Sequence, residues 1–230
     1  MVVYGRQPVR ELLAAGRRRV HEAWLTKGAA REGWVGELPV APKLVAADEL
    51  ARLAGSDAHQ GVAVRADGYP YVGAAELLAA PDALLVALDE VQDPQNLGAI
   101  ARTAEVAGAT GLVIPERRSA EVTPAACKAS AGAVEHLRIA RVRNLADFLA
   151  QAKDAGLWCY GADAAGVPYD RPDYRGGLVL VLGAEGKGLR PRVAASCDEL
   201  IALPVRGRVG SLNVSAAAAA LLYGILQSRG

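Results

Sequence analysis

Polar residues of types that can perform chemistry occur in three loop-like segments of this 230-residue chain. The segment DPQNLGAIART contains Asn96 and Arg102, LGAEGKGL contains Glu185, and VGSLNVS contains Ser211 and Asn213. Together, an arginine, a carboxylate, amides and a hydroxyl can bind a polar substrate, orient it and stabilise charge that develops on it. These five residues are therefore candidate site residues, provided that the fold brings them together.

The third segment precedes an alanine-rich run that favours a close-packed, buried helix from Ala216 onward. The first turn of a helix has backbone N–H groups without partners, so one Ser or Asn there is well explained as a cap. A single cap needs a single side chain, however, and the segment offers both Ser211 and Asn213. We predict that only part of this group is used for capping.

The other two segments also have purely structural interpretations. Asp93 or Asn96 can cap the helix that follows, and Arg102 can be a solvated helix residue, although its neighbours are small or apolar. Asn96 and Arg102 lie six positions apart, close to two helical turns, so a long Arg side chain could reach back toward the cap. The glycines around Glu185 match neither the dinucleotide fingerprint nor the phosphate loop, which leaves a tight turn at a strand end.

The elements that position these segments follow from hydrophobic patterning. Six apolar runs of strand length lie within 84–205, and helical patterns separate most of them. Near-continuous apolar strands that alternate with helices predict a parallel sheet covered on both faces. Ligands bind such sheets beyond the carboxyl ends of the strands, and the three segments follow strands. The predicted helices cover 96–107, 123–135, 145–155 and 190–195.

The chain is predicted to contain two units joined by a linker. Residues 1–66 alternate short helical and strand-like pieces, 67–83 carry Gly, Pro and Tyr and are typical of a linker, and 84–230 contain the regular apolar runs. Residues 1–66 contain 10 Lys and Arg against 7 Asp and Glu, whereas 67–230 contain 16 against 18. This asymmetry permits a nucleic-acid contact in the N-terminal unit without demonstrating one.

Composition excludes several classes of protein. With 52% hydrophobic and 22% charged residues, the chain can bury a core. Its three cysteines, Cys127, Cys159 and Cys197, are far apart and form no CxxC pair, which excludes a disulfide framework and a zinc site. No signal-peptide pattern is present, and the longest apolar run is too short to span a bilayer. We therefore expect a cytoplasmic protein with neither membrane nor metal among its partners.

Taken together, the three segments resemble the motifs of the SPOUT superfamily of RNA 2′-O-ribose methyltransferases, in the same order and with plausible separations. The matching stretches are DPQNLGAIARTAEVAG, LVLGAEGKGL and ALPVRGRVGSLNVSAAAAALLYGIL. VYGRQPVRELL and HQGVAVRA resemble the ends of the L30-like N-terminal domain of bacterial 23S rRNA guanosine-2′-O-methyltransferases. The resemblance covers nearly the whole chain.

The resemblance implies an α/β fold with a parallel sheet and a C-terminal trefoil knot, preceded by a small L30-like domain that binds RNA. It implies S-adenosyl-L-methionine as cofactor, 23S rRNA as the RNA partner and a homodimer. The expected reaction is methylation of a ribose 2′-hydroxyl, that of a guanosine. By motif, the cofactor contacts fall at Leu182, Gly183, Ile201, Leu203, Pro204 and Leu212.

The same resemblance assigns roles to the candidate site residues. It makes Arg102 central, with Asn96 holding it. A guanidinium has a pKa above about 12, so it is better suited to stabilise a developing alkoxide or grip a phosphate than to act as a base. Glu185 is expected to orient Arg102 or the ribose, and Ser211 and Asn213 to position the nucleotide.

Two alternatives stay open. The substrate could be a tRNA ribose, although that related branch lacks such an N-terminal domain, or the protein could bind RNA without catalysis, against which the intact motif residues argue. Basic residues in or near the three segments are candidates for RNA phosphate contacts. They are Arg117, Arg118, Lys187, Arg190, Arg206 and Arg208.

Overall fold

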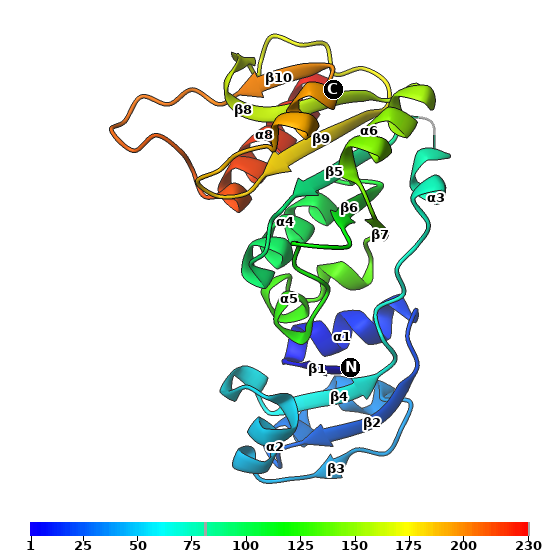
Figure 1. The fold of residues 1–230 in the computed structure, drawn as a ribbon. Coiled ribbons are helices and arrows are strands. Elements are labelled where there is room, and N and C mark those ends of the chain that lie inside the picture. Colours follow the sequence, from blue (N-terminus) through cyan, green and yellow to red (C-terminus); the bar gives the residue numbers. More distant parts are fainter. Residues whose placement is uncertain (81, 230) are drawn as a thin grey trace.

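The computed structural model describes residues 1–80 and 82–229 and contains two sheets, each with its own helices (Figure 1). The N-terminal sheet has four strands in the order β1-β4-β2-β3, with β4 antiparallel to both of its neighbours. The second sheet has six strands in the order β10-β8-β9-β5-β6-β7, and every neighbouring pair is parallel. The predicted parallel α/β sheet is thus confirmed.

The N-terminal domain places helices on both faces of its small sheet. Its strands are β1 (Val2–Tyr4), β2 (Val20–Leu25), β3 (Lys43–Leu44) and β4 (Val62–Ala66). Its helices are α1 (Arg6–Ala15) and α2 (Ala47–Ala54), together with the 3₁₀ turns η1 (Ala29–Arg31), η2 (Gly33–Glu37) and η3 (Asp57–His59). Helix α1 ends where Gly16 adopts the left-handed conformation, the usual way to terminate a helix.

The second domain repeats strand and helix along the chain, as the apolar runs predict. Its strands are β5 (Leu84–Asp89), β6 (Gly111–Pro115), β7 (Ile139–Val142), β8 (Trp158–Pro168), β9 (Leu178–Gly183) and β10 (Glu199–Ala202). Its helices are α4 (Pro94–Val106), α5 (Pro124–Ala129), α6 (Leu145–Asp154), α7 (Pro191–Ser196) and α8 (Val214–Arg229), with the 3₁₀ turn η4 (Ala133–Glu135).

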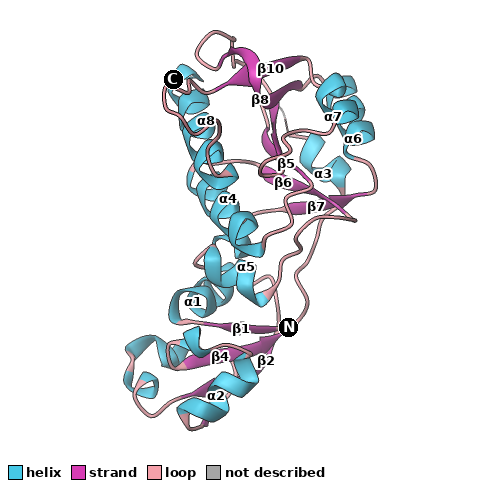
Figure 2. Cartoon of the chain, turned by 60° about the vertical axis from the view of Figure 1, so that its left-hand side comes forward, coloured by secondary structure: helices cyan, strands magenta, loops and turns pink. Residues whose placement is uncertain are grey.

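Helices cover both faces of the parallel sheet (Figure 2). Successive side chains of a strand point to opposite faces, and β5 shows the consequence. Val86 and Leu88 belong to a buried cluster with residues of α4 and α8, whereas Leu85 and Ala87 belong to one with residues of α6 and α7. Because β5 is buried on both faces, its sequence is a nearly continuous apolar run.

The segment predicted as a linker, 67–83, is folded onto the second domain over much of its described length. It contains α3 (Ala74–Leu78), in which Leu77 is fully buried. Tyr69 is also buried, and its hydroxyl donates to the carbonyl of Val134 at 3.1 Å. Glycine and proline in this segment shape a path along the domain surface, and its apolar side chains pack on that surface.

The two domains share a buried core. Val9 and Leu12 of α1 belong to the same cluster as Val134 of η4. At this boundary Arg18 pairs with Glu135 at 2.8 Å, and both side chains are only 1% exposed. A fully desolvated ion pair is stable only when both charges are present, so it joins the domains in one defined orientation.

Within the described residues, none of the helices is long and apolar enough to cross a lipid bilayer.

Candidate active site

The carboxyl ends of neighbouring strands bring the three predicted segments to one edge of the parallel sheet (Figure 1). The first segment follows β5, the second follows β9 and the third lies between β10 and α8. β9 pairs directly with β5, with Gly183 opposite Asp89 at the ends of the two strands. Segments about ninety residues apart in sequence therefore become neighbours.

Three of the five candidate residues form a hydrogen-bonded cluster. The Asn213 amide donates to Asn96 Oδ1 at 3.0 Å and to Glu185 Oε1, and the Asn96 amide donates to Glu185 Oε2 at 3.4 Å. Asn96 is buried, while Glu185 and Asn213 are exposed at the edge of the cluster. Each loop contributes one residue, and the carboxylate of Glu185 is held by two amide groups.

Asn96 does not cap α4, so its side-chain amide can take part in this cluster. Asp93 caps α4, since its Oδ1 accepts from the backbone N–H of Gln95 at 2.9 Å. Asn213 caps α8 with Oδ1, which accepts from the N–H of Ser215 at 2.8 Å. The amide nitrogen of Asn213 meanwhile binds the cluster. The prediction that only part of the third segment caps its helix is therefore confirmed, with Asn213 in both roles.

Arg102 does not reach Asn96. Its side chain lies exposed on α4, and the described residues offer its guanidinium no hydrogen bond or ion pair. Six helical positions correspond to a rotation of about 600°, so the two side chains leave the axis about 120° apart. The expectation that Arg102 reaches back to the cap is wrong for this reason. Ser211 is likewise exposed, away from the three-residue cluster.

A cavity of about 300 Å³ opens beside the cluster. Five of the six predicted cofactor residues line it, and the sixth, Pro204, is exposed and lies outside the lining. The second segment folds back tightly here, because a Cβ on Gly183 would lie 2.2 Å from the carbonyl carbon of Gly188. Ser211 also lines this cavity. The five lining residues are Leu182, Gly183, Ile201, Leu203 and Leu212.

A second cavity, of about 230 Å³, adjoins the first, since the two share lining residues. It is lined by Asp93 and Asn96 of the first segment, by Gln92 just before that segment, and by Lys187. Glu185 lines both cavities. Glu185 of the polar cluster therefore borders two spaces that can each hold part of a reacting pair.

Sequence reasoning missed the residue pair that anchors the second segment. Asp89, at the end of β5, is 1% exposed and accepts hydrogen bonds from the backbone N–H of Arg190 at 2.8 Å and from its Nε at 2.7 Å. The hydrogen bond to Asp89 raises the pKa of the Arg190 guanidinium. Arg190 thus holds the loop to the sheet. The sequence offered one signal for this pair, because Asp89 is a charged residue at the end of a buried strand.

A second residue that sequence reasoning missed is Asp163, which follows the part of β8 that pairs with β9 and lines the first cavity. The described residues contain no group of three or more His, Cys, Asp and Glu side chains placed to hold a metal ion.

Fold and site together define an α/β protein with a small-molecule cavity beyond the sheet edge and a polar reaction site beside it. Residues 83–223 match the model of the SpoU rRNA methylase family, and residues 2–72 match a model for RNA 2′-O ribose methyltransferase substrate binding. The chain belongs to the SpoU family of RNA methyltransferases, whose methyl donor is S-adenosylmethionine.

Two curated bacterial proteins match most or nearly all of this chain. YacO of Bacillus subtilis, named as a TrmH-family tRNA/rRNA methyltransferase, is 43% identical over 74% of this chain and 71% of its own length. An uncharacterized tRNA/rRNA methyltransferase of Mycolicibacterium vanbaalenii is 40% identical over 99% of this chain and 76% of its own.

Solved structures agree with this assignment. The SpoU methyltransferase AviRb of Streptomyces viridochromogenes, in complex with S-adenosylmethionine, has a TM-score of 0.84 at 26% identity, covering 99% of this chain and 89% of AviRb. An S-adenosylmethionine-bound rRNA methyltransferase of Sinorhizobium meliloti also has a TM-score of 0.84 at 26% identity, covering 98% and 86%.

The first cavity fits S-adenosylmethionine by its chemistry. Its volume lies at the lower end of the range for small-molecule sites, about 300–1,000 Å³. Apolar side chains such as Leu182 and Ile201 can flank an adenine, and loop backbone can read its edge. Among the described residues, the charged groups that line the cavity are carboxylates, which suits a ligand with a sulfonium and an ammonium group.

Proposed function

We propose that this protein methylates a ribose 2′-hydroxyl in RNA, and that the target is a guanosine of 23S rRNA. The observation that carries the proposal is the position of Glu185, which is held by Asn96 and Asn213 and lines both cavities. S-adenosylmethionine supplies the methyl group from the first cavity, and the ribose enters the second. Holding two reactants in line in this way removes much of the entropic cost of the reaction.

The residues of this chain then act on the ribose and on the nucleotide. Glu185 accepts a hydrogen bond from the ribose and orients it, because Asn96 and Asn213 fix the direction of its carboxylate. Ser211, at the mouth of the first cavity, positions the nucleotide. Arg102 lines neither cavity, so its long side chain must turn toward the bound RNA, where its guanidinium, which stays protonated, stabilises the negative charge that develops on the 2′-oxygen or binds an adjacent phosphate.

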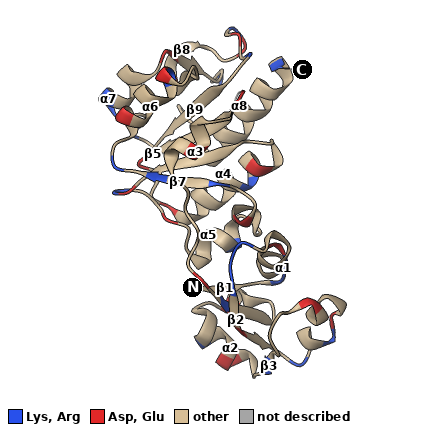
Figure 3. Cartoon of the chain, turned by 90° about the vertical axis from the view of Figure 1, so that its right-hand side faces the viewer, with Lys and Arg blue, Asp and Glu red and all other residues tan. Residues whose placement is uncertain are grey.

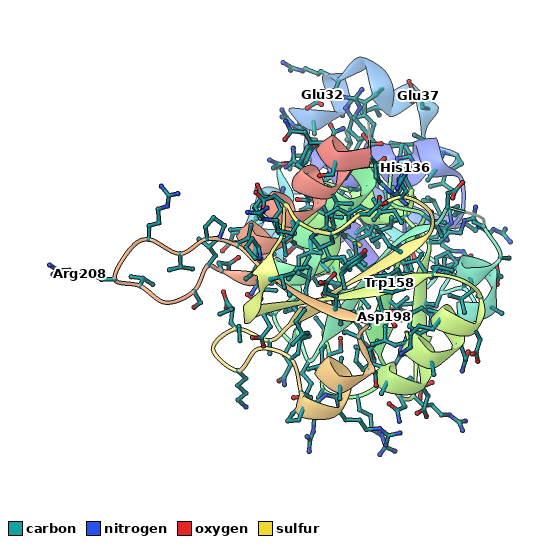
Figure 4. All side chains as sticks on the ribbon, turned by 90° about the horizontal axis from the view of Figure 1, so that it is seen from above. Glu32, Glu37, His136, Trp158, Asp198 and Arg208 are labelled. Atoms are coloured by element: carbon teal, nitrogen blue, oxygen red, sulfur yellow. The ribbon has the colours of Figure 1, made fainter. Side chains whose placement is uncertain are left out.

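The wider surface is consistent with an RNA partner. Arg206 and Arg208 are exposed on the loop before α8, and Figure 4 shows Arg208 at the end of a projection that leaves the body of the protein. Lys and Arg also occur along the N-terminal domain (Figure 3). Exposed arginines on a projecting loop suit contacts with RNA phosphates, which attract cations regardless of sequence. In this proposal the N-terminal domain is L30-like and works in the cytoplasm, where rRNA is assembled.

Two structural expectations belong to the same proposal. The segments after β9 and β10 would form the trefoil knot around the cofactor. A homodimer would cover exposed apolar side chains on the neighbouring helices α4 and α8, among which Val106 is 64% and Tyr223 50% exposed. Light scattering on the purified full chain measures the dimer directly, and a monomer at micromolar concentration would contradict it.

The decisive experiment measures methyl transfer from labelled S-adenosylmethionine to bulk rRNA and, separately, to bulk tRNA, followed by alkaline hydrolysis. A labelled, alkali-resistant dinucleotide from 23S rRNA supports the proposal, because a 2′-O-methyl group blocks cleavage at that position. Label in tRNA alone would assign the protein to tRNA ribose methylation. Cofactor binding without transfer to rRNA, tRNA or ribosome-assembly intermediates would favour the non-catalytic RNA-binding alternative.

A further inference from the structure

The cavity assigned to S-adenosylmethionine is lined by two carboxylates, Asp163 and Glu185, and by no Lys, Arg or His among the described residues. Most of the remaining lining is glycine, alanine and larger aliphatic side chains. In a cavity with few polar groups, charges are screened less than in bulk water. Two carboxylates without a cation among the lining residues therefore make this space favourable for a positive ligand.

The two carboxylates differ in how many hydrogen bonds they accept from the protein. Both oxygens of Glu185 accept hydrogen bonds from the amides of Asn96 and Asn213. Asp163 accepts one, from the backbone N–H of Ala165 to Oδ1 at 2.8 Å. Its Oδ2 has no hydrogen-bond partner among the described residues and lies 4.0 Å from the position of a Cβ on Gly188, another lining residue. Asp163 therefore has the greater remaining capacity to interact with a ligand.

The position of Asp163 places it inside the cofactor cavity rather than at the reaction site. It comes two residues after Gly161, the last residue of β8 that pairs with β9. It lines the first cavity and not the second, whereas Glu185 lines both. Its half-buried side chain thus faces a bound cofactor without bordering the space proposed for the ribose.

S-adenosylmethionine and the product S-adenosylhomocysteine differ in charge as well as in one methyl group. The cofactor has a positive sulfonium, which becomes a neutral thioether when the methyl group leaves, while both molecules keep the α-ammonium and the carboxylate. We propose that Asp163 is the counter-charge for the sulfonium, so that the cavity prefers the cofactor to the product. This inference rests on the assignment of the first cavity to S-adenosylmethionine.

The test is isothermal titration calorimetry on the full chain with three ligands. They are S-adenosylmethionine, S-adenosylhomocysteine and sinefungin, whose protonated amine replaces the sulfonium. Asp163→Asn keeps the side-chain shape and the acceptor for Ala165 but removes the charge. We expect the affinity for the two cationic ligands to fall about fivefold, the effect of a partly exposed ion pair, and that for S-adenosylhomocysteine to fall less than about twofold.

Two controls separate the charge effect from other causes. Asp170→Asn changes an exposed carboxylate nearby on the chain that does not line the cavity, and it should leave all three affinities unchanged. In the unsubstituted protein, added KCl should reduce the preference for the cationic ligands because salt screens charge. An equal fall for all three ligands in Asp163→Asn would overturn the proposal, since it would place Asp163 against the ribose or the α-ammonium. No fall would overturn it as well.

Failure of this inference is distinguishable from failure of the proposed function. The titrations use no RNA, so selective loss of the cationic ligands supports the inference even if no RNA accepts a methyl group. Conversely, methyl transfer to 23S rRNA together with equal binding losses would retain the proposed function and reject the role of Asp163.

Discussion

Asn213 uses the two ends of one side-chain amide for two purposes. Its oxygen caps α8, while its nitrogen binds Asn96 and Glu185. The amide therefore ties the start of α8 to the polar cluster. Of the common capping residues, only one with both an acceptor and a strong N–H donor can do this.

This dual role predicts that stability and activity can be separated at Asn213. Asn213→Ser keeps a good helix cap but loses the amide donor, so we expect unchanged stability and methyl transfer at least about tenfold slower, as for a lost active-site hydrogen bond. Asn213→Ala should lose the same activity and also about 1 kcal/mol of unfolding free energy. Urea unfolding and labelled methyl transfer measure the two effects. Equal stability of the two variants would contradict the capping role.

We expect that removal of the Arg102 side chain impairs catalysis but not cofactor binding. Because its guanidinium is exposed on α4 and does not line the first cavity, Arg102→Ala should leave the affinity for S-adenosylmethionine nearly unchanged. Loss of a group that stabilises transition-state charge should lower kcat/KM about a hundredfold. Arg143→Ala, which removes another exposed arginine, is the matched control. Parallel losses of binding and activity would rule out this role for Arg102.

At the scale of elements, α4 joins the site to the domain boundary. Asn96 lies in its first turn, and Gly98 lies against α5, where a Cβ would be 2.5 Å from Cβ of Ala129 and 2.7 Å from the carbonyl oxygen of Ala126. The absence of a side chain at Gly98 allows the two helices to touch. α5 in turn contacts β1 of the N-terminal domain. The position of Asn96 therefore depends on packing that begins in the other domain.

Substitution of Gly98 should disturb both stability and the site. Gly98→Ala must separate α4 from α5, and overpacking of this kind costs about 1–3 kcal/mol. Gly28→Ala is the control, because Gly28 has a helical conformation and open space around it, so we expect a change within about 0.5 kcal/mol. Urea unfolding compares the two variants. Equal effects would show that the contact with α5 can relax without cost.

At the scale of the whole molecule, the two domains behave as one unit because their boundary is a core. Arg18 and Glu135 are buried in it, and Arg17 donates to the carbonyl of Leu137 at 2.8 Å. Cys127 lies close to the pair, and burial raises the pKa of its thiol to about 12. The two domains are therefore held in a fixed relation.

Removing one partner of the buried pair should be far more harmful than removing both. Arg18→Met leaves the Glu135 carboxylate desolvated without a partner, which costs about 3–5 kcal/mol, whereas Arg18→Met with Glu135→Leu should recover much of this loss. Burial raises the pKa of Glu135 and Arg18 opposes that rise, so the single variant holds Glu135 protonated more readily. Its deficit should therefore grow as pH rises and shrink toward acid pH. Urea unfolding between pH 5 and pH 8 measures this, and a pH-independent deficit would contradict it.

Much of the fold could be predicted from the sequence because its signals are local. The apolar run at 84–91 predicts a strand buried on both faces, and β5 (Leu84–Asp89) is one. The alternation of such runs with helical patterns predicts a parallel sheet, which places the three polar segments at one edge. The segment 67–83, predicted as a linker, also contains α3 and buried side chains, because Gly and Pro signal an irregular path but not whether that path is packed on a domain.

The sequence by itself determined the fold class and which three segments meet beyond the sheet. Only the tertiary structure decided which side chains touch. Asn96 and Asn213 are 117 residues apart, and Arg18 and Glu135 are also 117 apart, so no local periodicity could pair them. Tertiary packing also decided the angle between Asn96 and Arg102 around α4 and the place of Asp163 in the first cavity. Such contacts depend on the packing of whole elements, whereas strand and helix formation depends on neighbours along the chain.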